Sequence, residues 1–259
     1  MELIDWTIQR KVPGGVIRAG FTSVAGGVSE GGWAGLNLGT HVGDNESAVA
    51  ENRRRLTEYL GCQPAWMDQV HSDRVAEAVG GATIPATDAL VVGPCAAARD
   101  TVRAQLPQAA CVMVADCVPL LLLSSQGLHA AAVHVGRAGF MKNIAAETIA
   151  VLGEEPHHLT AIIGPSICGR CYEVPEPMRD EARVVAPSSV SETSWGTPAI
   201  DIPAGLAEQL RRGGVDDIVF DGRCTYEDES LYSHRRMTKE GLPAGRFVGV
   251  VQLLSDTPA

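Results

Sequence analysis

Short apolar runs alternate with amphipathic segments along this chain, and the two periodicities predict a mixture of strands and helices. Apolar runs rich in β-forming residues predict strands at Val16–Thr22, Cys111–Leu123, Gly127–Val135, Leu159–Ile163, Asp217–Phe220 and Arg246–Leu254. Segments with helical spacing predict helices at Glu46–Leu60, Met141–Leu152, Pro175–Ala186 and Asp201–Arg212. The stretch Pro187–Pro198, rich in Ser, Thr and Gly, predicts a surface loop.

The helix at Glu46–Leu60 has the clearest end signals. Asp44 or Asn45 is a suitable N-cap, and Gly61 follows the last apolar position. The helices at Met141–Leu152 and Asp201–Arg212 likewise run into glycines, which predicts their ends.

The arrangement of these elements predicts the fold class. Only Ser124-Ser125-Gln126 separates the strands at Cys111–Leu123 and Gly127–Val135, so we expect an antiparallel hairpin. Helices and strands do not alternate strictly, which favours an α+β fold over a doubly wound parallel sheet. We therefore predict an α+β fold with mixed or antiparallel sheets flanked by helices, in a single domain spanning 1–259.

Composition and charge narrow the class of protein. The chain has 259 residues, of which 45% are hydrophobic and 20% charged, which is typical of a soluble globular protein. No run approaches the ~18 apolar residues of a membrane helix, and no secretory signal is present at the start, so we expect a cytoplasmic protein without membrane contact. A net charge of −10 argues against nucleic-acid binding. The oligomeric state does not follow from the sequence.

The cysteines are the first candidates for chemistry. Their number is odd, seven, which in a reducing compartment favours thiols or metal ligands over disulfides. Cys168-Gly169-Arg170-Cys171 has the C-x-x-C spacing of a redox or zinc site. It lacks a second pair and a surrounding βαβ pattern, so we interpret these two cysteines as unpaired thiols.

His71, Cys117 and His134 form the strongest candidate constellation. Cys117 and His134 lie on strands of the predicted hairpin, and His71 follows Gln69-Val70. One thiolate and two imidazoles suit a tetrahedral zinc ion with one position open for catalysis. By themselves these residue types are more typical of a core cysteine and hydrogen-bonded core histidines than of a metal site, because no local spacing joins them.

A larger set of short motifs resembles one known family in the same order along nearly the whole chain. These are Phe21-Thr22-Ser23, Gly26-Gly27-Val28-Ser29, Leu36-Asn37-Leu38-Gly39, His41-Val42-Gly43-Asp44, Asn52-Arg53, Gln69-Val70-His71, Thr87-Asp88-Ala89-Leu90, Ala115-Asp116-Cys117-Val118-Pro119, His134-Val135-Gly136, Ile163-Gly164-Pro165-Ser166-Ile167, Tyr172-Glu173-Val174, Cys224-Thr225 and Tyr232-Ser233-His234-Arg235-Arg236. Together they resemble the multicopper polyphenol oxidase (laccase-domain) family, also described as purine nucleoside phosphorylases.

The resemblance implies a fold, a metal and an activity. The fold is an α+β fold similar to that of cytotoxic necrotizing factor deamidases, and the metal is a catalytic zinc bound by His71, Cys117 and His134. The activities are phosphorolysis of adenosine, inosine and methylthioadenosine and deamination of adenosine, with purine nucleoside and phosphate as partners.

Substrate contacts are expected beside this centre. Asn37 and Arg53 border a glycine-rich loop and are candidates to face the pocket, and Arg137 is a third candidate. The family's His-Ala-Gly-Trp-Arg-Gly is replaced here by His134-Val135-Gly136-Arg137-Ala138-Gly139, so an arginine occupies the usual Trp position and alanine the usual Arg position. Neighbouring positions on an extended chain point to opposite faces, which puts the phosphate contact in question.

Other functions remain open at this stage. Copper(I) also accepts a thiolate and imidazoles, so a copper-dependent polyphenol oxidase is one alternative, although seven histidines are few for laccase chemistry. A metal-free cysteine hydrolase with Cys117 as nucleophile and His134 as base is another. A binding role in cell-wall assembly is the third.

Overall fold

Two β-sheets packed face to face form the centre of the molecule in this computed structural model, which describes residues 2–93 and 108–256. The larger sheet has six strands in the order β13-β10-β8-β9-β6-β4, and the smaller has four in the order β1-β2-β14-β7. The larger sheet combines antiparallel pairs with parallel pairs, β10 with β13 and β4 with β6. The prediction of an α+β fold with mixed and antiparallel sheets is confirmed, whereas the single-domain boundary 1–259 stays a prediction.

The described strands, in chain order, are β1 (Ile4–Val12), β2 (Gly15–Thr22), β3 (Trp66–Met67), β4 (Val75–Glu77), β5 (Thr83–Ile84), β6 (Ala89–Val92), β7 (Gln108–Val114), β8 (Val118–Ser124), β9 (Ala130–Val135), β10 (Leu159–Ile163), β11 (Val190–Glu192), β12 (Pro198–Ile200), β13 (Asp217–Phe220) and β14 (Phe247–Ser255). The described helices are α1 (Glu46–Leu60), α2 (Arg137–Met141), α3 (Ile144–Leu152), α4 (Glu176–Val185), α5 (Ile202–Arg212) and α6 (His234–Lys239).

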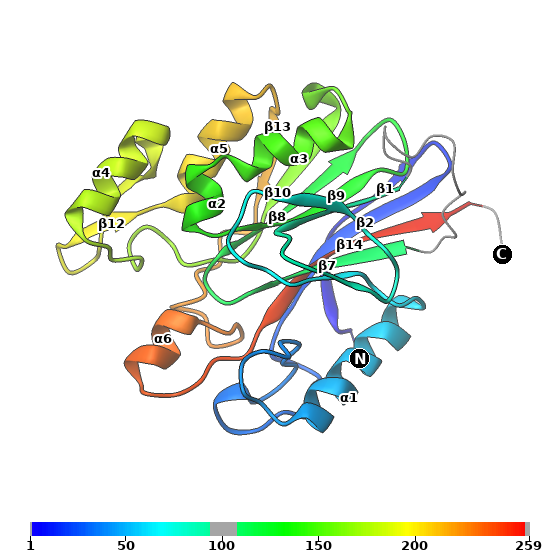
Figure 1. Cartoon of the computed structure of the whole chain (residues 1–259), viewed down its shortest axis with the longest axis horizontal. Helices are drawn as coiled ribbons and strands as arrows, with labels where there is room; N and C mark the ends of the chain where they lie inside the picture. Colours follow the sequence, from blue (N-terminus) through cyan, green and yellow to red (C-terminus); the bar gives the residue numbers. More distant parts are fainter. Residues whose placement is uncertain (1, 94–107, 257–259) are drawn as a thin grey trace.

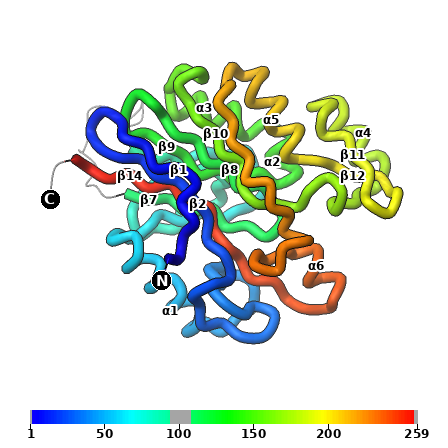
Figure 2. Tube along the Cα trace, turned by 180° about the vertical axis from the view of Figure 1, so that it is seen from behind, coloured from blue at the N-terminus to red at the C-terminus, as the bar shows by residue number. Residues whose placement is uncertain are grey.

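Helices cover the outer faces of both sheets, so the molecule is layered (Figure 1). Helices α2, α3 and α5 lie over the six-stranded sheet, and α1 lies beyond the four-stranded sheet. The view from behind shows the same order, with β1 and β2 on the near side (Figure 2). Three apolar clusters fill the interfaces between helices and large sheet, between the two sheets, and between small sheet and α1.

Strand alternation explains how one strand contributes to two of these clusters. In β7, Ala110, Val112 and Val114 point into the cluster between the sheets. The intervening Cys111 and Met113 point toward α1. Side chains alternate between the two faces of a strand. A run that is apolar at every position is therefore expected to be buried on both faces, as β7 is here.

Local signals predicted the helices well. Helix α1 begins and ends at the predicted residues, with the Asn45 side chain accepting from two backbone N–H groups and Gly61 in the left-handed conformation at φ 68°. The predicted helix at Met141–Leu152 is split, because Asn143 adopts a left-handed conformation (φ 58°) between α2 and α3. The expectation of a surface loop at Pro187–Pro198 is wrong for Val190–Glu192, which forms β11 and pairs antiparallel with β12, whereas the residues between the two strands form a turn.

Candidate functional site

The three predicted metal ligands converge although they come from separate segments. His71 lies between β3 and β4, Cys117 lies between β7 and β8, and His134 is the penultimate residue of β9. Their ligand atoms all lie within 4.8 Å of one another. The Cys117 Sγ is 3.8 Å from His71 Nε2, and the two imidazole rings meet edge to face at 4.7 Å between centroids. The donor set and its spacing therefore fit a metal ion.

Cys117 lies at a break in the chain, not within a strand. The predicted strand Cys111–Leu123 is wrong as a single element, because it is divided into β7 in the four-stranded sheet and β8 in the six-stranded sheet. Asp116 has a φ of 90°, a conformation that non-glycine residues rarely adopt. The change of direction carries the chain from one sheet to the other and places Cys117 immediately before the first residue of β8.

The predicted hairpin is confirmed and brings His134 close to Cys117. Strands β8 and β9 pair antiparallel, with Pro119 opposite His134 and Val118 opposite Val135. Cys117 immediately precedes β8, so the register of this pairing sets the distance between the thiol and the imidazole.

Asp88 connects two of the ligands and is a residue whose role the sequence did not reveal. Its carboxylate accepts from His134 Nδ1 at 2.8 Å and from the backbone N–H groups of Val70, His71 and Ser72 at 3.3, 3.0 and 2.6 Å. The Ser72 hydroxyl donates to it at 2.7 Å, and the Asp88 carbonyl accepts from His134 N at 2.7 Å. The only signal in the sequence was an acidic residue directly before the apolar run Ala89–Val92, and the structure shows that this carboxylate is fully buried.

This network fixes the orientation of both histidines. Because Asp88 engages Nδ1 of His134, the Nε2 atom of that ring is left for the metal site, as is usual for metal-binding histidines. His71 itself has a φ of 58°, and the hydrogen bond from its N–H to Asp88 holds the turn that presents its side chain.

Neighbouring charges stabilise a Cys117 thiolate beside a protonated His134. Burial raises the pKa of Asp88, but hydrogen bonds from His134 and Ser72 outweigh it and hold the pKa at about 2. Burial also raises the pKa of Cys117, and the adjacent His134 and His71 lower it to about 6. Burial lowers the pKa of His134, whereas Cys117 and Asp88 raise it to about 9. A thiolate is therefore available for a metal at neutral pH.

Gly136 provides the space that the ligands need. A Cβ atom at this position would lie 2.7 Å from His71 Cδ2 and 3.4 Å from Cys117 Sγ. Gly136 also precedes α2, so the backbone turns into the helix directly beside the ligands. Any other side chain here would displace the imidazole of His71.

Asp116 stabilises the break that presents Cys117. Its carboxylate accepts from Thr225 Oγ1 and from Arg235 N, both at 2.6 Å, and its carbonyl accepts from Ile167 N at 3.0 Å. The carboxylate is thus engaged away from the ligand cluster, which does not include Asp116. The sequence contained no signal that joins these distant segments.

Arg53, His41 and Arg246 lie near one another, and of these three Arg246 is close to Cys117. The guanidinium of Arg53 lies 3.9 Å over the Trp66 ring, and its Nε donates to Leu38 O at 3.0 Å. Burial lowers the pKa of His41, and the charges of Arg246 and Arg53 lower it further. Burial lowers the pKa of Arg246, and the nearby Cys117 thiolate partly offsets this by raising it.

Asn37 is fully buried, and its side chain forms hydrogen bonds with the backbone near these basic residues. Its amide nitrogen donates to Asp44 Oδ2 at 2.8 Å, and its amide oxygen accepts from Gly39 N at 3.0 Å and from Arg246 N at 2.8 Å. The residue therefore holds the loop and the backbone of Arg246 in place, and its side chain does not face solvent.

Arg137 directly follows Gly136 and is the first residue of α2. Its guanidinium is 3.7 Å from Glu181 Oε2 on α4, and its side chain is 33% exposed. Burial raises the pKa of the half-buried Tyr172, whereas the charges of Arg235 and Arg137 lower it. The Arg235 guanidinium is 5.3 Å from the Tyr172 ring. Arg137 is thus placed at the edge of the site but is partly neutralised by a surface carboxylate.

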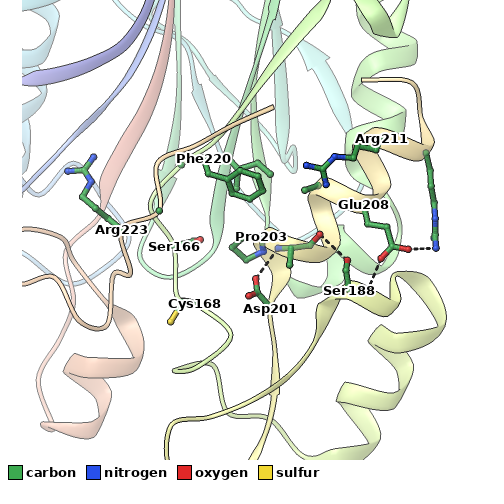
Figure 3. Close-up of a pocket in the computed structure, with 15 residues that line it drawn as sticks. Ser166, Cys168, Ser188, Asp201, Pro203, Glu208, Arg211, Phe220 and Arg223 are labelled. Carbon is green, nitrogen blue, oxygen red and sulfur yellow. Dashed lines mark hydrogen bonds and ion pairs between the residues drawn. The ribbon is translucent and has the colours of Figure 1, made fainter. Parts of the chain in front are cut away.

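A separate pocket of about 580 Å³ lies beside α5 and the ends of β10 and β13. Figure 3 shows its lining, where Ser188, Asp201 and Glu208 are engaged in local hydrogen bonds. None of the three predicted ligands lines it. The metal-ligand geometry, and not the size of a cavity, therefore identifies the candidate active site.

The six cysteines within the described ranges have free thiols, and Cys95 lies outside those ranges. Cys168 and Cys171 lie close to Cys224 and Glu227.

Within the described ranges, no helix is both long and apolar enough to cross a bilayer.

Comparison with known proteins identifies the family of this chain. The model of the family described as multi-copper polyphenol oxidoreductase laccase matches residues 18–254. A purine nucleoside phosphorylase of Corynebacterium glutamicum is 43% identical over 247 residues, covering 92% of this chain and 94% of the relative. A purine nucleoside phosphorylase of Pseudomonas aeruginosa is 35% identical, covering 96% of each chain.

Solved structures show the same fold. A Neisseria meningitidis protein of the DUF152 family superimposes with a TM-score of 0.82 at 30% identity, covering 98% of this chain and all of that one. YlmD from Geobacillus stearothermophilus gives a TM-score of 0.80 at 27% identity, covering 97% of this chain and all of that one. The chain therefore belongs to the multi-copper polyphenol oxidoreductase laccase family, as its motifs predicted.

Proposed function

We propose that this protein is a zinc-dependent purine nucleoside phosphorylase that also deaminates adenosine, with His71, Cys117 and His134 as its metal ligands. The observation that carries the proposal is the convergence of these three donor atoms within 4.8 Å, with Asp88 orienting His134. The purine nucleoside phosphorylases at 43% and 35% identity support the substrate class. Adenosine, inosine and methylthioadenosine are the proposed substrates.

Zinc fits the donor set better than the cluster of coppers of a laccase. One thiolate and two imidazoles are typical zinc ligands and leave one position for substrate or water. Of the seven histidines, all of which lie in the described ranges, only His71 and His134 join a cluster of three or more metal-binding side chains there. When bound, zinc supplies Lewis-acid polarisation of an oxygen atom.

The protein's own groups account for binding and orientation. Asp88 holds His134 and the turn of His71 in one arrangement, so little reorganisation is needed at the ligands. Arg246, Arg53 and Arg137 are the groups proposed to balance the charge of phosphate. Asn37 supports this role indirectly by holding the backbone of Arg246.

Deamination and phosphorolysis make different demands on these groups. Attack of water at C6 of adenosine releases ammonia and needs no second substrate. Displacement of the purine from C1′ requires bound phosphate, and hence the arginines. Where the family has an arginine this chain has Ala138, and Arg137 stands directly before it. This difference is therefore proposed to affect phosphorolysis, whereas the metal ligands are unchanged.

The direct test is incubation of zinc-loaded protein with adenosine or inosine, with and without phosphate, followed by chromatography of the products. We expect phosphate-dependent release of adenine or hypoxanthine, and phosphate-independent formation of inosine from adenosine, both lost in His71→Ala. Inosine formation alone would limit the proposal to deamination. No product with zinc demonstrably bound would refute the nucleoside proposal.

A metal-free cysteine hydrolase is the second candidate, favoured by one observation. Cys117, His134 and Asp88 form a thiolate–imidazole–carboxylate series, the arrangement that activates a nucleophile. His71 has no function in such a series, whereas a metal requires it as the third ligand. Chelator-stripped protein that hydrolyses activated esters or amides, and loses this activity on alkylation of Cys117, would establish the hydrolase.

A further inference from the structure

Away from the site described above, four side chains with metal-binding atoms meet at one point. Cys168, Cys171, Cys224 and Glu227 bring three sulfur atoms and a carboxylate oxygen within 4.8 Å of one another. In a tetrahedral zinc site with Zn–S bonds of about 2.3 Å, neighbouring sulfur atoms lie about 3.8 Å apart. Slight tightening of this cluster would therefore produce a complete set of four ligands.

The backbone around these residues has the form of two facing turns. Cys168 and Cys171 are spaced C-x-x-C, and Cys171 N donates to Cys168 O at 2.9 Å. Cys224 and Glu227 have the same spacing, and Glu227 N donates to Cys224 O at 3.1 Å. Pairs of ligands three residues apart on two turns are typical of structural zinc sites. The second pair that the C-x-x-C motif lacked in the sequence is supplied by the fold.

The two turns are held together without any contribution from a metal. Cys168 N donates to Cys224 Sγ at 3.4 Å, as backbone N–H groups do to metal-bound thiolates. Thr225 N donates to Ser166 O at 3.1 Å, joining the segment after β10 to the segment after β13. Arg236 on α6 donates to the carbonyls of Thr225, Tyr226, Asp228 and Leu231 and so fixes the second turn.

Burial and charge also suit a cation. Cys171 and Cys224 are only 3% and 6% exposed, whereas Cys168 and Glu227 lie nearer the surface and provide an entry path. Three thiolates and a carboxylate exceed the charge of a zinc ion, and Arg170 offsets part of the excess through its ion pair with Glu227 at 3.6 Å. Gly169 packs so closely against Asp201 that a Cβ would lie 2.7 Å from its side chain, which fixes the position of the first turn.

We propose that Cys168, Cys171, Cys224 and Glu227 bind a second, structural zinc ion that joins the loops following β10 and β13. The site is closed, because the protein supplies all four ligands, so its zinc has no position for substrate. Of the four proposed ligands, Cys168 also lines the pocket in Figure 3. The proposal is independent of the nucleoside activity.

Zinc content separates the two sites. Protein expressed in zinc-supplemented medium and purified under reducing conditions is expected to contain two zinc ions per chain by elemental analysis. His71→Ala and Cys168→Ser are each expected to contain one, and the double variant none. Cys62→Ser is the matched control, because Cys62 is a half-buried free thiol outside both clusters, and it is expected to retain two.

Cobalt distinguishes the sites by their sulfur content. After replacement of zinc by cobalt, the thiolate-to-cobalt absorption of His71→Ala, which retains three thiolates, is expected to be about three times that of Cys168→Ser, which retains Cys117 alone. Glu227→Gln changes only an exposed ligand, so the fold is not at risk, and we expect faster loss of one zinc to a chelator.

Four experimental outcomes would contradict the proposed second zinc site. One zinc per chain in the wild type and none in His71→Ala would overturn the proposal, as would unchanged zinc retention in both Cys168→Ser and Glu227→Gln. A disulfide among the three cysteines in protein purified without oxidant, or copper in place of zinc at this cluster, would also overturn it.

Discussion

The two clusters of metal-binding side chains differ in how the chain assembles them. His71, Cys117 and His134 come from three separate segments, and a buried carboxylate, Asp88, orients two of them. The second cluster consists of two local turns of equal spacing that supply four ligands. Three ligands would leave one position of a tetrahedral zinc ion open in the first cluster, as the proposed catalysis requires. The second is closed and local, as a structural link requires.

Removal of a ligand should have the largest and most selective effect. Cys117→Ser is expected to lower phosphorolysis and deamination by about 10³-fold or more, because the metal contributes several kcal/mol to transition-state stabilisation. The zinc of the second cluster should remain, so the content should fall from two ions to one. Inosine turnover and elemental analysis on the same sample measure both. Loss of both ions would show that the clusters are not independent.

Asp88→Asn tests the carboxylate that distinguishes the first cluster. We expect about 10- to 100-fold weaker zinc affinity at His71, Cys117 and His134, because partners of metal ligands typically contribute that much. Competition with a chromogenic chelator measures it. Asp73→Asn is the control, since Asp73 forms only a surface ion pair with Lys142 at 3.5 Å. Equal affinity in the two variants would contradict the role of Asp88.

Gly136→Ala tests the space beside the ligands. The new Cβ would lie 2.7 Å from His71 Cδ2, so His71 must move, and we expect zinc affinity at this site to fall by about tenfold. Gly80→Ala is the matched control, because its Cβ would meet only Gln63 O at 3.4 Å. Crystal structures of the variant with zinc would reveal the displacement. An unmoved His71 with unchanged affinity would refute the steric argument.

Thr225→Val asks whether the second cluster influences the first. Thr225 follows Cys224 and donates to Asp116 Oδ1 at 2.6 Å, beside Cys117. We expect kcat to fall about fivefold with both zinc ions retained, because a hydrogen bond to a charged group contributes roughly 1.5–3 kcal/mol, of which part affects the position of Cys117. Thr148→Val removes a buried hydroxyl that bonds within α3, and it should leave kcat unchanged. Equal kcat in both variants would mean that the clusters do not communicate.

Local features of the sequence predicted local structure, and this explains what was found and what was missed. Helix α1 followed from Asn45 and Gly61, which act within a few residues of the helix ends. The division of Cys111–Leu123 was not visible, because both halves are apolar and only the positive φ of Asp116 separates them. The sheet order depends on long-range pairing and carries no local signal.

The same distinction applies to the sites. The resemblance of their motifs predicted the three residues of the first cluster as ligands, and their role as ligands stays a prediction. The hydrogen bonds of Asp88 were not predicted, since its partners lie in distant segments. The C-x-x-C motif at Cys168 and Cys171 was interpreted as two free thiols because no second pair stood nearby in the sequence. Cys224 and Glu227 reach it only through the parallel alignment of β10 with β13 and the bridge between Ser166 and Cys224.

Because of the break at Asp116, the spacing within the candidate metal site depends on how the two sheets pack against each other. Cys117 marks the crossing from β7 to β8, whereas His134 belongs wholly to the larger sheet. Any sliding of one sheet over the other would therefore alter the distance between sulfur and imidazole, although no residue near the metal had changed. Overpacking at a remote inter-sheet position such as Val112 or Leu121 would then impair catalysis before it measurably lowered stability, because misplacement by about 1 Å is enough to slow a reaction about 10²-fold.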